Sequence, residues 1–515
     1  MRRFAFFLLL ISLPSCRASD AAKTSGQVVA IQNLLTEERL SEAQSSLIQA
    51  LAAQPDDAAL WNLRGIIDAK LGNVPGAEEA FEKAVRLAPQ LMSAWLNLGR
   101  LHQLNSGHSE AIAKGIRAYQ SVLRIEPTNA EAHHQLALFL EWKGAFRESL
   151  EHLDRLPPQD RIRRQAMALR CADEAALGNT KVALRLADDL MRDSQLQEAD
   201  VTAVLPAISA NEGVALRLLE GLESRGLASD QTKSSLAVLY ERQGKLTSAR
   251  NKYELIFRSS PASATLTDLA RVAWKQKDFE STLSYLAHAR DLAPDDAGIH
   301  FFFALTCNEM RLPVEARKSI EKALALAPEN PYYNYAMGVM LLQWAEKDGA
   351  VPFLKRYVSA QPSDPRGHLA LAAAYFGTSH NDDARRELAG IMGTSQARAG
   401  SQYLLGRIAA QEGDVTGAIA HFKQVVTLEP NSSDAHAQLA DLLFGKEDLE
   451  GARRETAASL ALDPDNYAAN RTLLRLYRIA KDPRLKSQTE RLKTLVEQND
   501  ANLRLLQRTI KVQPW

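Results

Sequence analysis

Histidine is the residue whose spacing in this chain most suggests chemistry. His133, His300, His368 and His436 are separated by multiples of about 34 residues. Regularly spaced imidazoles are typical of metal ligands. However, packed helices lie roughly 8–10 Å apart, whereas zinc requires ligands roughly 2 Å away. We therefore interpret the four histidines as packing residues.

The search for other reactive groups identifies no catalytic motif. The sequence contains no GxxxxGKS/T, GxGxxG, GxSxG, HExxH or CxxC pattern. Its three cysteines are too few for a disulfide scaffold or a cysteine-rich zinc module. Lys+Arg and Asp+Glu both number 62, so overall charge gives no basis for binding nucleic acid. The sequence predicts a protein that is not an enzyme and needs no cofactor or metal.

The first 16 residues have the order of an export signal. Arg2 and Arg3 precede a ten-residue apolar run that ends at Leu13. As a helix this run spans roughly 15 Å, which is too short to cross a bilayer. The following residues, Leu-Pro-Ser-Cys, resemble a bacterial lipobox, in which Cys16 carries the lipid, although Pro14 departs from the pattern.

The alternative to lipidation is ordinary cleavage near Ala18. Residues 17–26 are polar and suit a flexible tether in either case. We expect an exported protein, lipid-anchored in the periplasm or at the outer membrane, or soluble if Cys16 is not lipidated. The N-terminal lipid would be its only attachment to the membrane.

The body of the chain is periodic. Prolines recur mostly at intervals of 33 or 34 residues, at Pro55, Pro89, Pro261, Pro294, Pro328, Pro362, Pro430 and Pro464. Small residues recur in two series twelve residues apart, as at Gly65 and Ala77, and a bulky residue such as Phe81 follows four residues later. Small residues let two helices approach closely, and proline ends a helix. The period therefore predicts pairs of antiparallel helices, with the bulky residue filling the gap to the next pair.

This pattern resembles the tetratricopeptide repeat. The residues that carry the resemblance in the first clear unit are Trp61, Gly65, Ala77, Phe81, Ala84 and Pro89. The resemblance implies an all-α, right-handed superhelical solenoid of about 12–13 repeats. We count twelve units from about Thr24 to Asp465 and a partial thirteenth.

The repeats vary in regularity along the chain. Residues 27–156 form a first block, and residues 228–465 form a second. Between them, residues 157–227 lack the terminal prolines, and Pro206 should kink a first helix. Residues 466–515 hold a partial repeat and a basic capping helix, because residues 471–515 contain eleven basic and four acidic side chains.

In the resembling family, the first helix of each pair lines a concave groove that binds peptides. The register places five aromatic residues there: Phe301, Tyr332, Tyr335, Phe376 and Tyr403. Large aromatic side chains are typical anchors of binding hot spots, although they could instead pack between repeats. Arg407, Arg471 and Arg475 would add charge on the C-terminal side, or the last two would belong to a solvated cap.

Two functional hypotheses follow from these features. The first is a non-catalytic scaffold of the bacterial cell envelope, which binds a protein or peptide segment in the groove. The alternative is a regulatory or binding arm of a separately encoded envelope enzyme, such as a transferase or polysaccharide export machinery. The sequence indicates neither the partner's identity nor the oligomeric state.

Overall fold

The computed structural model describes residues 26–104, 109–498 and 512. Within these residues every regular element is a helix and there is no strand, which confirms the all-α prediction. None of the described helices is long and apolar enough to cross a membrane. The predicted signal, Cys16 and nearly all of the tether lie outside the described residues.

The chain divides into two compact units, residues 1–252 and 253–515. The helices of the first unit are α1 (Gly26–Thr36), α2 (Leu40–Ala53), α3 (Ala58–Lys70), α4 (Val74–Leu87), α5 (Met92–Leu104), α6 (Ser109–Ile125), α7 (Ala130–Lys143), α8 (Phe146–Asp154), α9 (Pro158–Arg161), α10 (Arg164–Ala176), α11 (Thr180–Arg192), α12 (Glu198–Thr202), α13 (Leu205–Ile208), α14 (Glu212–Ser224) and α15 (Asp230–Arg242). The boundary between the units falls within α16 (Leu246–Ser259).

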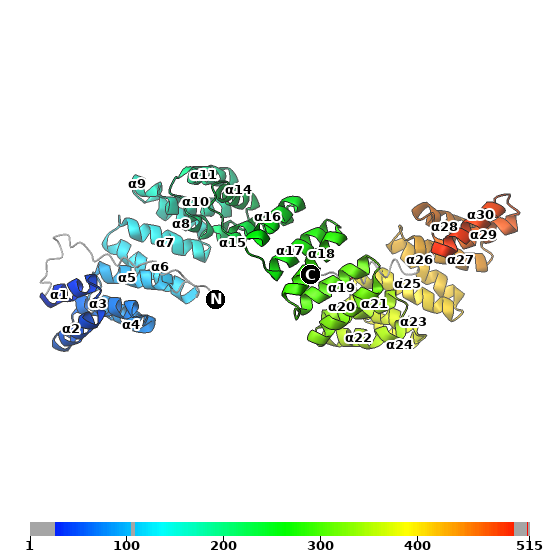
Figure 1. Ribbon diagram of the computed structural model, residues 1–515, viewed down its shortest axis with the longest axis horizontal. Helices are drawn as coiled ribbons and strands as arrows, with labels where there is room; N and C mark the ends of the chain where they lie inside the picture. The colour runs from blue at the N-terminus through cyan, green and yellow to red at the C-terminus, as the bar shows by residue number, and fades with distance from the viewer. Residues whose placement is uncertain (1–25, 105–108, 499–511, 513–515) are drawn as a thin grey trace. The chain divides into compact units, whose positions relative to one another are not determined.

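The second unit continues the same alternation of helices. Its members are α17 (Ser263–Lys275), α18 (Phe279–Leu292), α19 (Ala297–Glu309), α20 (Pro313–Leu326), α21 (Pro331–Gln343), α22 (Lys347–Ala360), α23 (Pro365–Gly377), α24 (Asn381–Ala389), α25 (Ser395–Gln411), α26 (Val415–Leu428), α27 (Ser433–Gly445), α28 (Leu449–Leu462), α29 (Tyr467–Ala480) and α30 (Leu485–Gln498). Figure 1 shows these helices following one another as pairs.

The described helices form fourteen pairs, with α9 standing apart and with α12 and α13 together replacing one first helix. The sequence count of twelve units and a partial thirteenth was therefore too low. Thirteen of these pairs lie between Gly26 and Leu462, one more than the twelve units counted up to Asp465, and α29 with α30 makes the fourteenth. In the two terminal pairs, Ile31 and Leu474 stand where the other first helices carry glycine, alanine or cysteine. Pro206 lies in the first turn of α13, so the expected kink is a complete break between α12 and α13.

Each pair is held by a large side chain of the second helix that packs on the small residue of the first. A methyl group added at Gly65 would lie 2.5 Å from the Phe81 ring. A methyl group added at Gly338 would lie equally close to Leu354, at 2.5 Å. The bulky residue therefore closes its own pair, which corrects the expectation that it fills the gap to the next pair.

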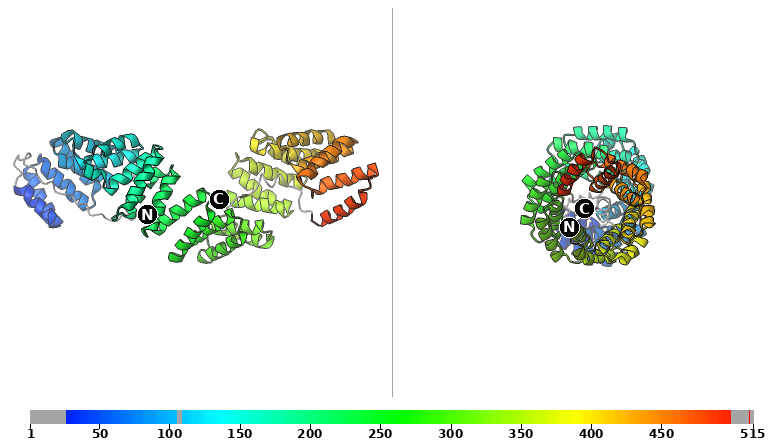
Figure 2. Two further views of the ribbon diagram at one scale, coloured as in Figure 1. Left: turned by 90° about the horizontal axis from the view of Figure 1, so that it is seen from above. Right: turned by 90° about the vertical axis from the view of Figure 1, so that its right-hand side faces the viewer.

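Successive pairs are joined in two ways, by contacts between their first helices and by contacts of each second helix with the next first helix. In the second unit α19 contacts α21, α21 contacts α23, and α23 contacts α25. The second helices instead make their main contacts with the first helix of their own pair and of the next pair, as α20 does with α19 and α21. Among the described residues of the second unit, no two second helices of successive pairs make a comparable contact, so these first helices lie closer to one another than the second helices do. Figure 2 shows the same helices in two further views.

The contact between Gly338 and Leu354 predicts a specific sensitivity to size. Gly338→Ala should lower the free energy of unfolding by about 1–3 kcal/mol, because the added methyl group overpacks the pair. Urea denaturation followed by circular dichroism would measure this change. Gly445→Ala is the matched control, because a methyl group there meets no atom within 4 Å. Equal midpoints for the two variants would contradict the packing described here.

Candidate functional site

The five aromatic residues expected to line the groove differ in exposure. Phe301 is 7% exposed, and Tyr335 and Tyr403 are each 2% exposed. Tyr332, by contrast, is 53% exposed, and Phe376 is half-buried. The expectation that all five rings present a face to a ligand is therefore wrong for three of them.

The three buried rings pack against other aromatic rings of the solenoid. The centroid of the Tyr335 ring lies 4.6 Å from that of Tyr357 on α22. Tyr403 packs edge-on against Phe422 of α26, with centroids 5.6 Å apart. Phe301 lies 4.7 Å from Tyr333 of the following pair. Tyr335 and Tyr403 are therefore covered by the second helix of their own pair, whereas Phe301 is covered by the next first helix.

Two arginine–phenylalanine contacts recur at the same register. The guanidinium of Arg407 lies 5.3 Å from the Phe376 ring centroid, and that of Arg475 lies 4.0 Å from the Phe444 centroid. Arg475 also forms an ion pair with Asp441 at 2.5 Å, and Arg471 pairs with the same carboxylate at 3.0 Å. Arg407 has no carboxylate partner among the described residues. Of the three arginines, it is therefore the one whose charge is available to a ligand.

The first helices of the N-terminal unit carry a polar ladder that sequence reasoning missed. The side-chain amide of Asn97 donates to Asn62 at 3.0 Å, and both residues are buried. One pair further on, Arg100 forms two hydrogen bonds to Glu131, at 2.7 and 2.8 Å. The interval between Asn62 and Asn97, one repeat plus one residue, is the signal that could have identified this ladder. Its groups satisfy one another, so it is a stacking contact between first helices.

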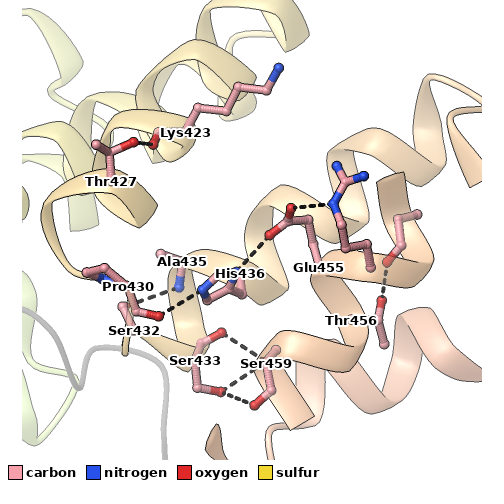
Figure 3. Close-up of polar contacts among 12 residues, drawn as sticks. Lys423, Thr427, Pro430, Ser432, Ser433, Ala435, His436, Glu455, Thr456 and Ser459 are labelled. Atoms are coloured by element: carbon pink, nitrogen blue, oxygen red, sulfur yellow. Dashed lines mark hydrogen bonds and ion pairs between the residues drawn. The ribbon is translucent and has the colours of Figure 1, made fainter. Parts of the chain in front are cut away.

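The regularly spaced histidines cap the prolines that end the preceding pairs. Nε2 of His436 lies 3.0 Å from the carbonyl oxygen of Pro430, as Figure 3 shows. The indole N–H of Trp61 donates to Pro55 at 2.7 Å, and the amide of Asn334 donates to Pro328 at 2.9 Å. The same contact, six residues back to a proline, is made by Trp95, His133, His300, His368 and Asn470.

This contact accounts for the histidine period without a metal. In the described part of the chain, no three His, Cys, Asp or Glu side chains are grouped to hold a metal ion. The ring only has to present one N–H to a carbonyl oxygen that the helix end leaves unpaired. The four histidines therefore have a specific structural role, which is to hydrogen-bond the proline carbonyl oxygen six residues earlier.

In three of the four histidines, the second ring nitrogen contacts a side chain of the second helix, nineteen residues later. Nδ1 of His368 lies 2.6 Å from Glu387, and Nδ1 of His436 lies 2.7 Å from Glu455. Each of these two rings therefore lies between a proline carbonyl oxygen and a carboxylate. The equivalent contact of His133 is to Nδ1 of His152, at 2.9 Å. That contact requires one neutral ring as the acceptor.

The histidine pair makes the first unit sensitive to acid. Burial, the neighbouring His133 and Arg155 lower the pKa of His152 to about 4. A histidine whose folded pKa is depressed contributes stability above its unfolded pKa, roughly 6.5, and this stability is lost as the pH falls toward 4. Because the ring is partly exposed, we expect a loss on the order of 1 kcal/mol.

His152→Gln should reduce this acid sensitivity, since an amide can hydrogen-bond to His133 but cannot gain a proton. Thermal unfolding midpoints at pH 7 and pH 4.5 would be compared between variant and wild type. His288→Gln, at an exposed ring, serves as the control. If His152→Gln retains the full wild-type difference between the two pH values, the pair does not carry the effect.

Two buried carboxyl groups elsewhere in the first unit also have displaced pKa values. Burial raises the pKa of Asp173 to about 8, and the nearby Glu141 contributes in the same direction. Burial alone raises the pKa of Glu141 to about 7. Asp173 is fully buried in the apolar core beside Cys171 and Ala172. A substrate cannot reach such a group, so these pKa shifts reflect the core and do not indicate a catalytic site.

Three family models match parts of the chain. A model described as the TPR domain of cytochrome c-type biogenesis protein H matches residues 18–161. Two models described as tetratricopeptide repeat match residues 369–436 and 409–476. The matched segments fall on α1 to α9 and on α23 to α29, at the two ends of the helical array.

Individual proteins resemble shorter segments. The probable biofilm formation methyltransferase WspC of Pseudomonas putida is 32% identical over 105 residues, which are 19% of this chain and 25% of that protein. Tetratricopeptide repeat protein 33 of Xenopus laevis is 35% identical over 103 residues, which are 20% of this chain and 38% of that protein. The chain therefore spans well under two thirds of either relative. A solved tetratricopeptide repeat protein from Parabacteroides merdae is 16% identical with a TM-score of 0.41, covering 48% of this chain and 98% of that one.

Proposed function

Because the chain is a tetratricopeptide repeat protein, we propose that it is a non-catalytic scaffold of the bacterial cell envelope. It holds an extended segment of a partner protein against the first helices α21, α23 and α25. Repeat arrays of this kind present extended concave surfaces for binding. The observation that carries the proposal is the accessible group of Tyr332, Phe376 and Arg407 on this face.

These three side chains supply the features that a peptide anchor needs. Tyr332 offers an exposed ring near the start of α21, and Phe376 offers a half-buried ring near the end of α23. Arg407 lies over the Phe376 ring and has no carboxylate partner among the described residues. An apolar side chain of the partner would pack on the rings, while an acidic one would pair with Arg407.

The paired arginines further along have a supporting role. Arg471 and Arg475 share Asp441, so a ligand would have to compete with that carboxylate. Charges at the rim of an interface mainly influence association rate and salt dependence. The binding energy is therefore assigned to the rings on α21 and α23.

The envelope location rests on the N-terminal sequence. Two arginines, an apolar run and Cys16 form the pattern of an exported and lipidated chain. A protein tethered at residues 17–26 would present its repeats to partners at the membrane surface. Nothing in this role requires a reaction, a cofactor or nucleic acid.

Photo-crosslinking tests the groove directly. A benzoylphenylalanine at position 332 or 376, in the native host, should crosslink to one discrete protein segment that mass spectrometry can identify. Arg407→Glu should reduce the yield several-fold, because it reverses the charge that attracts the ligand. The same group at positions 292 and 314 is the control, since Leu292 and Val314 are at least as exposed as Tyr332 and lie on second helices. Equal crosslinking at all four positions would refute the groove.

Fatty-acid labelling tests the lipid anchor. The wild-type protein, labelled in the native host with an alkyne analogue of palmitate, should incorporate the label, and Cys16→Ser should not. Cys171→Ser is the control, because that thiol is buried. Equal labelling of wild type and Cys16→Ser, or no labelling of wild type, would favour soluble export.

A further inference from the structure

A pocket of about 590 Å³ lies in the second unit where α24, α25 and α26 meet. Met392 comes from the turn after α24, and Arg398 and Gln402 come from α25. Lys423 and Leu428 come from α26. Its volume is within the range of pockets that hold small molecules or side chains, roughly 300–1,000 Å³. None of these residues belongs to the groove of the proposed function.

The pocket exists because this repeat ends irregularly. Helix α24 has nine residues, whereas α20, α22, α26 and α28 each have fourteen. The turn that replaces its missing end contains Gly390 and Gly393, and Gln396 stands where a proline ends the regular repeats. This turn, at Met392 and Gly393, and the last turn of α26, at Leu428, line the same pocket.

The polar contact that closes regular repeats is also changed here. Gln402 occupies the position of the proline-capping Trp, His or Asn residues. It has no proline carbonyl to cap, but it keeps the contact nineteen residues later, because its side-chain oxygen lies 2.6 Å from Nδ1 of His421. Gln402 is buried, so it forms a fixed polar floor for the pocket.

Two exposed cations stand at the pocket without internal partners. Neither Arg398 nor Lys423 forms an ion pair with any described residue, whereas many other basic side chains of this chain do. Figure 3 shows the Lys423 side chain extended, with its ammonium group free of any marked interaction. Met392 and Leu428 add apolar surface beside them, and Leu428 is 43% exposed.

We propose that this pocket is a second binding site, which takes a peptide segment with a carboxylate beside an aliphatic side chain. The carboxylate pairs with Arg398 and Lys423, and the aliphatic side chain covers Met392 and Leu428. Arginine and lysine both bind carboxylates, and arginine does so with two parallel hydrogen bonds. The site acts independently of the groove and would let the scaffold hold two segments at once, which raises overall avidity.

A peptide fits the pocket better than a free lipid chain does. The cations are exposed at its rim, the pocket is open to solvent, and most of its lining residues carry polar side chains. A long alkyl chain requires a mostly apolar, enclosed cavity. A short side chain next to a carboxylate matches both the size and the mixed character of this pocket.

The experiment uses the methyl group of Met392 as a local probe. The full-length protein is labelled with ¹³C at its methionine methyl groups, and Met392→Leu assigns the signal. The ligand probe is the heptapeptide Gly-Ser-Leu-Glu-Leu-Ser-Gly with blocked ends. We expect the Met392 signal to shift saturably with added peptide, and the apparent Kd to rise with ionic strength.

Three comparisons make the result decisive. The same peptide with Gln in place of Glu should bind at least tenfold more weakly. Arg398→Glu/Lys423→Glu should also weaken binding at least tenfold, while Lys318→Glu/Lys446→Glu, with the same change in net charge, should not. Tyr332→Ala/Phe376→Ala should leave this binding unchanged, which separates the pocket from the groove.

Defined results would overturn the proposal. It fails if the Met392 signal does not shift, if the Gln peptide binds as well as the Glu peptide, or if the pocket double variant retains the wild-type affinity. A shift with dodecanoate but not with the peptide would replace the peptide with a lipid-like ligand.

Discussion

The close approach of the two helices within each pair is the constraint on which the rest of the structure depends. It requires a small residue on the first helix. A large side chain of the second helix then packs on that small residue. Gly65 with Phe81, Gly99 with Tyr119, and Gly406 with Phe422 satisfy this requirement. Once each pair is fixed at this separation, its first helix faces the first helix of the next pair. The face that could bind a partner follows from this contact.

This constraint explains what sequence reasoning could and could not predict. The period and the helix pairing follow from local rules, and the structure has them as expected. Glycines in the left-handed conformation, such as Gly72 and Gly144, end first helices. The number of pairs was underestimated by one, and the two terminal pairs depart from the small-residue rule at Ile31 and Leu474. The break at Pro206 was more severe than a kink, because the proline begins a new short helix.

The aromatic residues show where local rules stop. Their register correctly put them on first helices, but exposure depends on what the neighbouring helix carries. Tyr335 is covered because Tyr357 occupies α22 opposite it, and Tyr403 is covered by Phe422. Tyr332, three residues from Tyr335, remains open. The pocket between α24 and α26 was equally invisible, since it arises from a helix turn that is missing rather than from residues that form a motif.

The bond from a side-chain N–H to the proline carbonyl has a consequence for how such arrays can vary. Indole, imidazole and carboxamide groups all make it here, at Trp61, His436 and Asn334. The proline carbonyl oxygen at the helix end needs an N–H donor that can reach it, and the type of side chain that carries this N–H does not matter. A repeat can therefore replace the tryptophan at this position with histidine or asparagine while its geometry is unchanged. A search for repeats that compares residue types at this position will miss repeats that a comparison of hydrogen-bond donors would find. In such a chain, the regular structure will therefore extend over more repeats than the regular sequence does.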